Sequence, residues 1–351
     1  MNPGEIWWGQ IGNSLRFLIN VANTLQDCHS AVLQVSRTIP WRRDFYEAID
    51  IKRSSFSAER RLVRLQCEEN ADPGEFVLDQ LCSDKVRAEY WPGLPYAEYL
   101  ALMEDIELND CYVWIAGIHS KSDLTQWVNF VSQYTRHSGN PEQRGVFILE
   151  YDGPGAETSD LPVIAYSVEN YDCRVFCLEM SAALNNTELQ SYQAELALCI
   201  GDNDPEFCAA LLLAGQDLIR DPVKTTRRVS DTGANSEGCL FSEKTEQQIN
   251  SAAWNAAVVL LFPILERYRM NVVSKHENEL STYLPITNSN GDAVEDPYDL
   301  EIGSLYYIVS THGKSFEPSE SETIKFCRKV RNLLAHNRFV PCEDVRKVMS
   351  L

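Results

Sequence analysis

The chain has 351 residues, with 31 lysines and arginines against 51 aspartates and glutamates, so its formal net charge is −20. This length predicts two domains of ordinary size, and a composition that is 44% hydrophobic and 23% charged excludes wholesale disorder. The net charge argues against a non-specific nucleic-acid coat, because binding to phosphates needs a cationic surface.

The sequence also bears on compartment and metal binding. Its first residues, MNPGE, contain neither the basic nor the apolar segment of a secretory signal, and no apolar run reaches the ~18–20 residues of a membrane helix. The eleven cysteines are scattered, lie mostly in apolar segments and form no CxxC pair, so the spacing of a zinc site is missing. We therefore expect a cytoplasmic protein with reduced thiols, no membrane contact and no metal site.

Through the first half of the chain, short apolar runs typical of buried strands alternate with helical spacings of apolar residues. The apolar runs predict strands at 31–35, 61–66, 111–118 and 145–150. The helical spacings predict helices at 13–26, 97–107 and 123–134. Two further stretches, at 161–168 and 173–180, end the series. This alternation predicts an α/β domain over residues 1–185, with a mostly parallel sheet covered on both faces.

From residue 186 the pattern becomes helical. Helices are expected at 188–198 and 205–218, followed by a polar loop or linker at 221–240. Ser242 is a candidate N-cap for a long helix that extends to Tyr268. We therefore expect residues 186–240 to be a helical connector and linker.

The last part of the chain reads as an all-α bundle over residues 241–351. An acidic, turn-rich loop is expected at 286–296, and Asp296 with Pro297 is a candidate N-cap and first residue of the next helix. The pattern from Ser319 to Glu322 resembles a capping box, and Pro341 begins a short terminal helix.

The first candidate site is the segment Gly9-Gln10-Ile11-Gly12-Asn13-Ser14, which precedes a helix. A glycine-bearing turn at a helix N-terminus can offer backbone N–H groups to a phosphate. Downstream, Glu150 ends an apolar strand, as does the carboxylate that places Mg²⁺ in many ATPases. The order of turn, helix, buried strands and acidic strand end resembles a P-loop NTPase domain over about half of the chain.

This resemblance implies a nucleotide site formed by Gly9, Gly12, Asn13, Ser14 and Glu150. The sequence departs from the family at the lysine of GxxxxGK[ST], which is missing. Binding of ATP by this domain and an α/β scaffold without nucleotide are therefore two open alternatives.

The second candidate site is Arg331-Asn332 followed by His336, an R-N-x-x-x-H pattern at the end of a predicted helix. Metal-free RNA cleavage needs a base for the 2′-OH proton and a cation for the phosphate; His and Arg suit these tasks. On a straight helix Arg331 and His336 would lie about 140° apart. They converge if the helix ends near Ala335, with Asn337 as its stop, or if a second subunit supplies the partner motif.

This segment resembles the HEPN superfamily, whose signature is an arginine, often followed by a polar residue, and then a histidine after a short gap. Arg331, Asn332 and His336 fill these positions, and residues 296–310, with Asp299-Leu300-Glu301, look like the preceding helix of many members. The resemblance covers residues 242–351 well. It implies an α-helical bundle, catalytic roles for these three residues, metal-independent cleavage of RNA without a cofactor, and dimers in which two motifs share one groove.

The charge distribution is consistent with a local phosphate site. Residues 323–351 carry a net charge of +5, so the rest of the chain carries −25. Of these cations, Arg328, Lys329 and Arg338 flank the motif and are expected to contact RNA phosphates. Lysines and arginines near a helix C-terminus also stabilise the helix dipole, which is the alternative reason for their presence.

Two functions of different classes follow. In the first, the chain is a regulated, homodimeric ribonuclease of a prokaryotic defence or toxin system, and its α/β domain senses a signal or a partner protein. In the second, it is a non-catalytic assembly subunit whose bundle only dimerises. A third, weaker option is an ATP-dependent regulator that uses the segment from Gly9 to Ser14.

Overall fold

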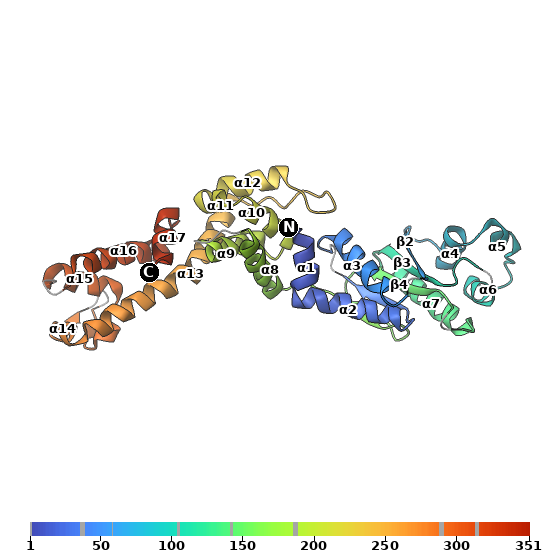
Figure 1. Ribbon diagram of the computed structural model, residues 1–351, viewed down its shortest axis with the longest axis horizontal. Coiled ribbons are helices and arrows are strands. Elements are labelled where there is room, and N and C mark those ends of the chain that lie inside the picture. Colours follow the sequence, from blue (N-terminus) through green and yellow to red (C-terminus); the bar gives the residue numbers. More distant parts are fainter. Residues whose placement is uncertain are drawn as a thin grey trace. The chain divides into compact units, whose positions relative to one another are not determined.

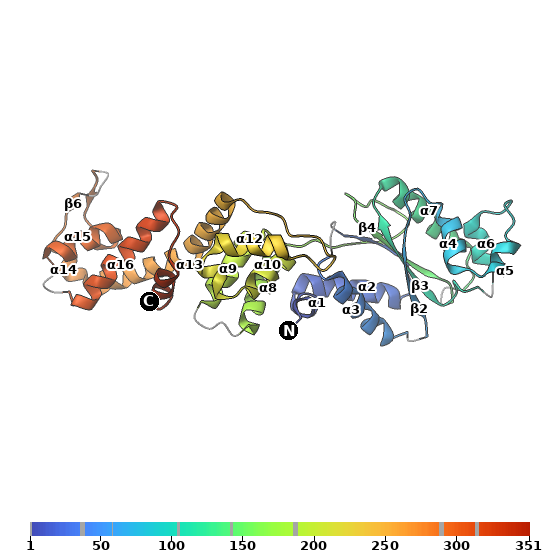
Figure 2. The ribbon, with the colours of Figure 1, turned by 90° about the horizontal axis from the view of Figure 1, so that it is seen from above.

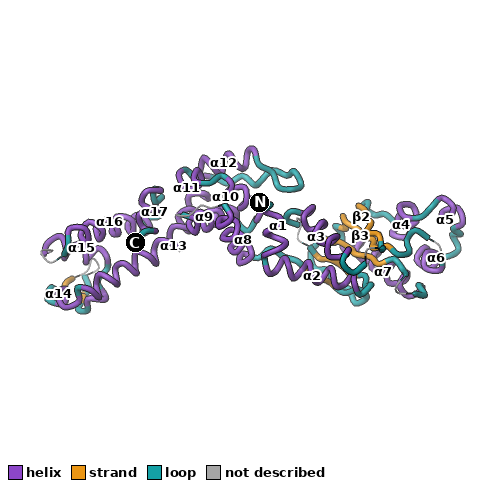
Figure 3. The backbone as a smooth tube through the Cα atoms, in the orientation of Figure 1, coloured by secondary structure: helices purple, strands orange, loops and turns teal. Residues whose placement is uncertain are grey.

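The computed structural model describes residues 2–35, 39–57, 59–103, 106–140, 143–184, 189–287, 291–312 and 316–351 of the chain. The chain folds as two compact units, Met1–Asp172 and Cys173–Leu351 (Figure 1). The first unit is mixed α/β and the second is helical, with one short pair of strands among the elements described in it (Figure 3). The predicted combination of an α/β domain and a helical part is confirmed.

The first unit is built on a five-stranded sheet. Its strands are β1 (Ala31–Gln34), β2 (Arg61–Gln66), β3 (Cys111–Ile118), β4 (Val146–Tyr151) and β5 (Val163–Ala165). All neighbouring strands are parallel, in the order β2-β3-β4-β1-β5. All six residues of β4 are buried, as expected for a central parallel strand with both faces covered.

Helices cover both faces of this sheet (Figure 2). One group consists of α1 (Pro3–Gln10), α2 (Gly12–Gln26) and α3 (Arg42–Ser54), which contact each other. The second group consists of α4 (Pro73–Leu81), α5 (Asp84–Glu89), α6 (Tyr96–Leu102) and α7 (Lys121–His137). On the side of the second group, the fully buried ring of Trp127 joins β3 and β4 residues in one apolar core.

The second unit is helical throughout most of its described length. Its helices are α9 (Gln190–Gly201), α10 (Pro205–Leu213), α11 (Gln216–Arg220), α12 (Pro222–Thr232), α13 (Glu246–Lys275), α14 (Glu277–Ser281), α15 (Ile302–His312), α16 (Pro318–Ala335) and α17 (Cys342–Met349). The 30-residue α13 contacts α9 and α12 as well as α16 and α17. Residues 173–180, which close the predicted α/β series, lie in α8 (Asn170–Ala183), which crosses the boundary between the units.

Several predicted boundaries in this unit are wrong. Residues 222–232, predicted as linker, form α12: Asp221 caps it and Pro222 is its first residue, and both cues lie within a polar run. The long helix begins with a capping box at Thr245 and not at Ser242. The box predicted from Ser319 is also absent, since α16 already begins at Pro318.

The region 286–302 is more structured than expected. Its acidic loop contains the antiparallel pair β6 (Ile286–Thr287) and β7 (Ala293–Val294). Asp296 caps the short 3₁₀ helix η1 (Pro297–Asp299), and α15 begins only at Ile302.

Helix α13 also corrects one exclusion drawn from the sequence. By length and composition it is apolar enough to cross a membrane. Ala253, Ala256, Leu261 and Val273 are among its buried residues. Core helices of globular proteins pass the same test of length and composition.

Candidate functional site

The candidate site lies at the C-terminal end of α16. The apolar stripe Ile324, Cys327, Val330 and Leu334 is buried and holds the helix on the bundle. The helix ends at Ala335, as predicted.

Asn337 is the reason for this helix end. It adopts the left-handed conformation, with φ of +52°. Its N–H donates to the Leu334 carbonyl at 3.2 Å, and the Arg338 N–H donates to the Leu333 carbonyl at 2.9 Å. These bonds satisfy carbonyls of the last turn, and they move the chain off the helix axis directly after His336. Asn337 is thus the predicted stop.

The motif residues are accessible at this end. Asn332 and His336 are exposed, and Arg331 retains 35% of its side-chain accessibility. Within the described part of the chain, the side chains of Asn332, His336 and Arg338 form no hydrogen bond or ion pair. Arg331 differs, because one guanidinium nitrogen lies 3.0 Å from Oε2 of Glu301.

A tryptophan fixes the helix end against α13. The indole N–H of Trp254 donates to the Leu334 carbonyl at 2.7 Å. The bond joins residues 80 positions apart in the sequence. The backbone that carries His336 is therefore anchored, while its side chain is left in solvent.

The cations expected to contact phosphate lie on the same helix or directly after it. The Arg328 guanidinium stacks over the Tyr306 ring at 4.6 Å, and the Lys329 ammonium pairs with Asp344 at 2.7 Å. Arg338 is exposed. Arg328 and Arg338 can thus approach a phosphate directly. Lys329 would have to give up its ion pair with Asp344 to bind a phosphate. The sequence missed the partners Glu301 and Tyr306; only the resemblance pointed to the segment that contains Glu301.

The first candidate site has a different geometry from the one expected. Gly9 lies inside α1, and Gly12 begins α2, so the segment joins two helices and follows no strand. The Ser14 hydroxyl is fully buried at 3.1 Å from the Tyr166 hydroxyl, which also accepts the indole N–H of Trp7 at 2.8 Å. The predicted phosphate-binding turn is therefore a helix junction with a buried hydroxyl.

Asn13 and Glu150 are likewise engaged inside the first unit. The Asn13 amide donates to the Ser167 carbonyl at 2.9 Å and to Asp172 at 3.1 Å. Glu150 is 4% exposed and accepts hydrogen bonds from the Tyr46 hydroxyl and the Trp114 indole, each at 2.9 Å.

Arg42 completes the surroundings of Glu150 through an ion pair with its carboxylate. Burial, followed by the charge of Glu150, raises the pKa of Tyr46 to about 12, so this phenol remains a donor. The Glu150 carboxylate is thus held by three protein donors, which do not leave it facing a Mg²⁺ ion.

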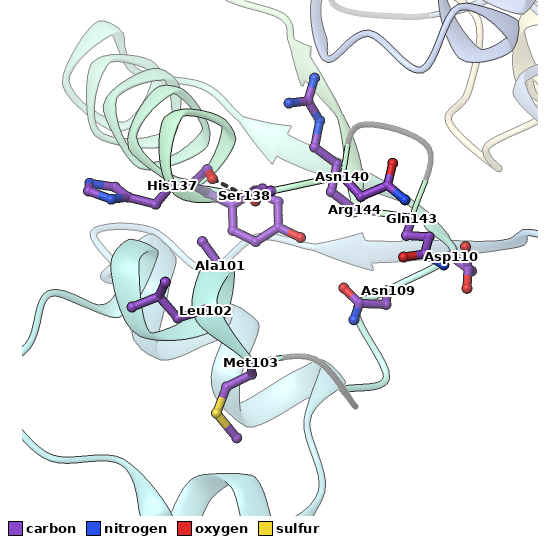
Figure 4. A pocket seen from close by; sticks show the side chains of 12 residues that line it. Ala101, Leu102, Met103, Asn109, Asp110, His137, Ser138, Asn140, Gln143 and Arg144 are labelled. Carbon is purple, nitrogen blue, oxygen red and sulfur yellow. Dashed lines mark hydrogen bonds between the residues drawn. The ribbon is translucent and has the colours of Figure 1, made fainter.

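A cavity of about 740 Å³ lies elsewhere in the first unit, near the amino ends of β3 and β4 (Figure 4). Figure 4 shows the side chains of Asn109, Asp110 and Gln143 close together, with Met103 on another side. Its described lining includes none of the predicted site residues. In open parallel sheets ligands bind outside the carboxyl ends of the strands, which is the opposite edge.

Comparison with known proteins identifies no relative of this chain. Searches against protein-family models and against curated proteins found no match to the chain. The site therefore rests on its own residues: an arginine, an amide and a histidine at a capped helix end.

Proposed function

We propose that this chain is a regulated, metal-independent endoribonuclease of the HEPN type, acting as a cytoplasmic homodimer in a prokaryotic defence or toxin system. The observation that carries this proposal is the end of α16. There Asn332 and His336 are exposed and have no side-chain partner among the described residues, next to an arginine that is two-thirds covered and paired with Glu301.

The residue types supply the parts of a transesterification. The 2′-oxygen of a ribose forms a bond to phosphorus, and the bond from phosphorus to the 5′-oxygen breaks. His336 takes the proton from the 2′-hydroxyl or returns one to the 5′-oxygen. Arg331 binds the phosphate oxygens as negative charge builds on them, and Asn332 contacts the substrate or orients His336. No cofactor is needed for these steps.

A homodimer supplies what one motif lacks. In an RNA groove shared by two copies, the histidine of one copy and the arginine of the other can flank the same phosphate. Arg328, Lys329 and Arg338 then hold neighbouring phosphates. The net charge of −25 outside residues 323–351 repels RNA from the rest of the surface and confines it to this groove.

In this proposal the α/β unit is an NTPase-like sensor or scaffold that docks a partner protein of the same system. Its parallel sheet supports the coarse part of the resemblance. The burial of Ser14 and the three donors on Glu150 argue against ATP at the residues that the sequence suggested.

One observation favours the second candidate function, a non-catalytic assembly subunit. The Arg331 guanidinium already has an ion-pair partner in Glu301, as it would in a purely structural helix corner. In that case the bundle dimerises and the motif contacts no RNA.

The deciding experiment compares cells that express the wild type, Arg331→Ala or His336→Ala, together with purified proteins incubated with total RNA and EDTA. We expect growth arrest and RNA cleavage for the wild type and for the control variant named next, and neither effect for Arg331→Ala or His336→Ala. The matched control is Arg267→Ala, which removes an exposed arginine on α13. Intact RNA with the wild type, in cells and in vitro, or equal cleavage by all four proteins, would exclude the nuclease and leave the assembly subunit.

A further inference from the structure

The carboxyl edge of the sheet in the first unit carries residues that the proposed function does not use. Strands β1 and β4 are neighbours in the sheet. The chain leaves β1 for β2 at one edge of the sheet, and it leaves β4 for β5 at the opposite edge. Such a reversal is a topological switch point, where open α/β sheets bind their ligands outside the carboxyl ends of the strands.

At this edge a histidine and an aspartate form a pair. His119 directly follows β3, and Asp152 directly follows β4. The Nδ1 atom of His119 lies 2.8 and 2.9 Å from the two carboxylate oxygens of Asp152. The pair therefore joins the ends of two adjacent strands.

A β-bulge produces this juxtaposition. The register between β3 and β4 shifts between Ile115 and Ile118, where Gly117 has a φ of +85°. A φ of +85° is a conformation that residues with a side chain rarely adopt, so the bulge favours glycine at this position. Bulges commonly redirect a side chain next to a functional site, and this one directs His119 onto Asp152.

The pair leaves one ring nitrogen for a ligand. With Nδ1–H donated to the Asp152 carboxylate, Nε2 is directed away from it. The His119 side chain is 56% exposed, whereas Asp152 is 25% exposed. A carboxylate bound to one ring nitrogen fixes the orientation of the ring and determines which nitrogen faces the solvent.

A lysine lies at the same corner. The Nζ atom of Lys121 is 3.9 Å from the position of a Cβ on Gly155, so the ammonium lies over the connection that Asp152 begins. Lys121 is also the first residue of the 17-residue α7, whose N-terminus adds partial positive charge. The nearby Asp123 carboxylate accepts the Ser120 hydroxyl at 2.7 Å.

We propose that His119 and Lys121 bind the phosphate group of a small phosphorylated ligand, and that Asp152 is the positioning residue for His119. This site is separate from the α16 motif and does not depend on the proposed nuclease activity. His119 and Lys121, the first residue of α7, both lie against the connection that Asp152 begins. A phosphate oxygen accepts hydrogen bonds from an ammonium group, from helix N–H groups and from an imidazole that carries protons on both nitrogens.

The test is calorimetric titration of the full chain with two probes, AMP and inorganic phosphate, at millimolar concentrations. We expect saturable binding that His119→Gln and Lys121→Ala each weaken by about tenfold. Equal binding of both probes assigns the site to a free phosphate ion, and binding of AMP alone assigns it to a phosphate ester. Absence of saturable binding by both probes would overturn the proposal.

The matched controls are His137→Gln at the other end of α7 and Lys85→Ala on α5, both exposed, which should leave binding unchanged. Circular dichroism verifies that each variant is folded, and Lys121→Ala serves alone if the His119 variant unfolds.

Asp152→Asn should weaken binding and change the His119 ring-nitrogen NMR signals in the free protein. Equal affinities in the wild type and in both site variants would contradict the assignment.

Discussion

Glu150 ends the apolar run of β4, and its carboxylate is among the most buried charges in the described part of the chain. Removing a carboxylate from water is costly unless donors replace the lost hydration. Tyr46, Trp114 and Arg42 supply those donors from α3 and β3. The acid at this strand end therefore joins α3 to the sheet.

This arrangement predicts the effect of removing its cation. Arg42→Ala leaves a buried carboxylate with two neutral donors, so we expect the free energy of unfolding to fall by about 3 kcal/mol. Urea denaturation followed by tryptophan fluorescence measures the change. The control is Arg43→Ala on the same helix: Arg43 is 90% exposed, and its pair with Glu47 should contribute below about 0.5 kcal/mol. An equally small loss for both variants would refute the stabilising role of Arg42.

The ion pair between Arg331 and Glu301 leads to a second prediction. Glu301 is 68% exposed, and its carboxylate competes with a phosphate for the guanidinium. Glu301→Gln should therefore raise RNA affinity about two- to fivefold, as expected for an exposed pair worth up to about 1 kcal/mol. Fluorescence anisotropy in a His336→Ala background measures this without cleavage. Glu322→Gln, in an exposed pair with Lys325, is the control. Weaker binding by Glu301→Gln would show instead that the carboxylate positions Arg331.

At the scale of secondary-structure elements, the end of α16 links backbone conformation to function. Asn337 holds φ at +52°, which glycine adopts freely and a β-branched residue does not. We expect Asn337→Gly to preserve RNA cleavage. Asn337→Val should lower cleavage at least about tenfold and stability by about 1–2 kcal/mol, because the turn that places His336 is lost. Cleavage assays and thermal unfolding separate the two effects. Full activity in the valine variant would show that the cap does not position His336.

The elements also show what local sequence can specify. Strands β3 and β4 were predictable because continuous apolar runs are typical of parallel strands buried on both faces. The end of α16 was predictable because asparagine tolerates the left-handed conformation. Helix α12 was missed because its buried face includes Thr225 and Thr226, which do not produce an apolar periodicity.

The partners of the site residues were not predictable at all. Arg42 and Glu150 are 108 positions apart, and Arg331 and Glu301 are 30 apart. Such pairs are set by tertiary packing, and no local pattern encodes them. The same holds for His119 and Asp152, whose proximity depends on strand order and on the bulge at Gly117.

At the scale of the whole molecule, partly and fully buried cysteine thiols couple stability to alkaline pH. Burial raises the pKa of Cys199 and Cys327 to about 12 and that of Cys82 to about 11, from an ordinary value of 9.0. Above pH 9 the unfolded chain releases these protons while the folded chain retains them. The unfolded state then binds fewer protons, so the free energy of unfolding falls as pH rises, and the contribution of each thiol is fully lost only above its folded pKa.

The last prediction follows from this fall in the free energy of unfolding with rising pH. Between about pH 8 and pH 10 the fully buried Cys327 should account for a loss of about 1.4 kcal/mol in the free energy of unfolding. Urea denaturation at both pH values, under reducing conditions, measures the loss, and Cys327→Ala should reduce it by that amount even if the variant is less stable at both. Cys239→Ala, which removes an exposed thiol, is the control and should leave the pH dependence unchanged. A wild type equally stable at both pH values, or an unchanged loss in Cys327→Ala, would show that the Cys327 thiol ionises as easily in the folded chain as in the unfolded one.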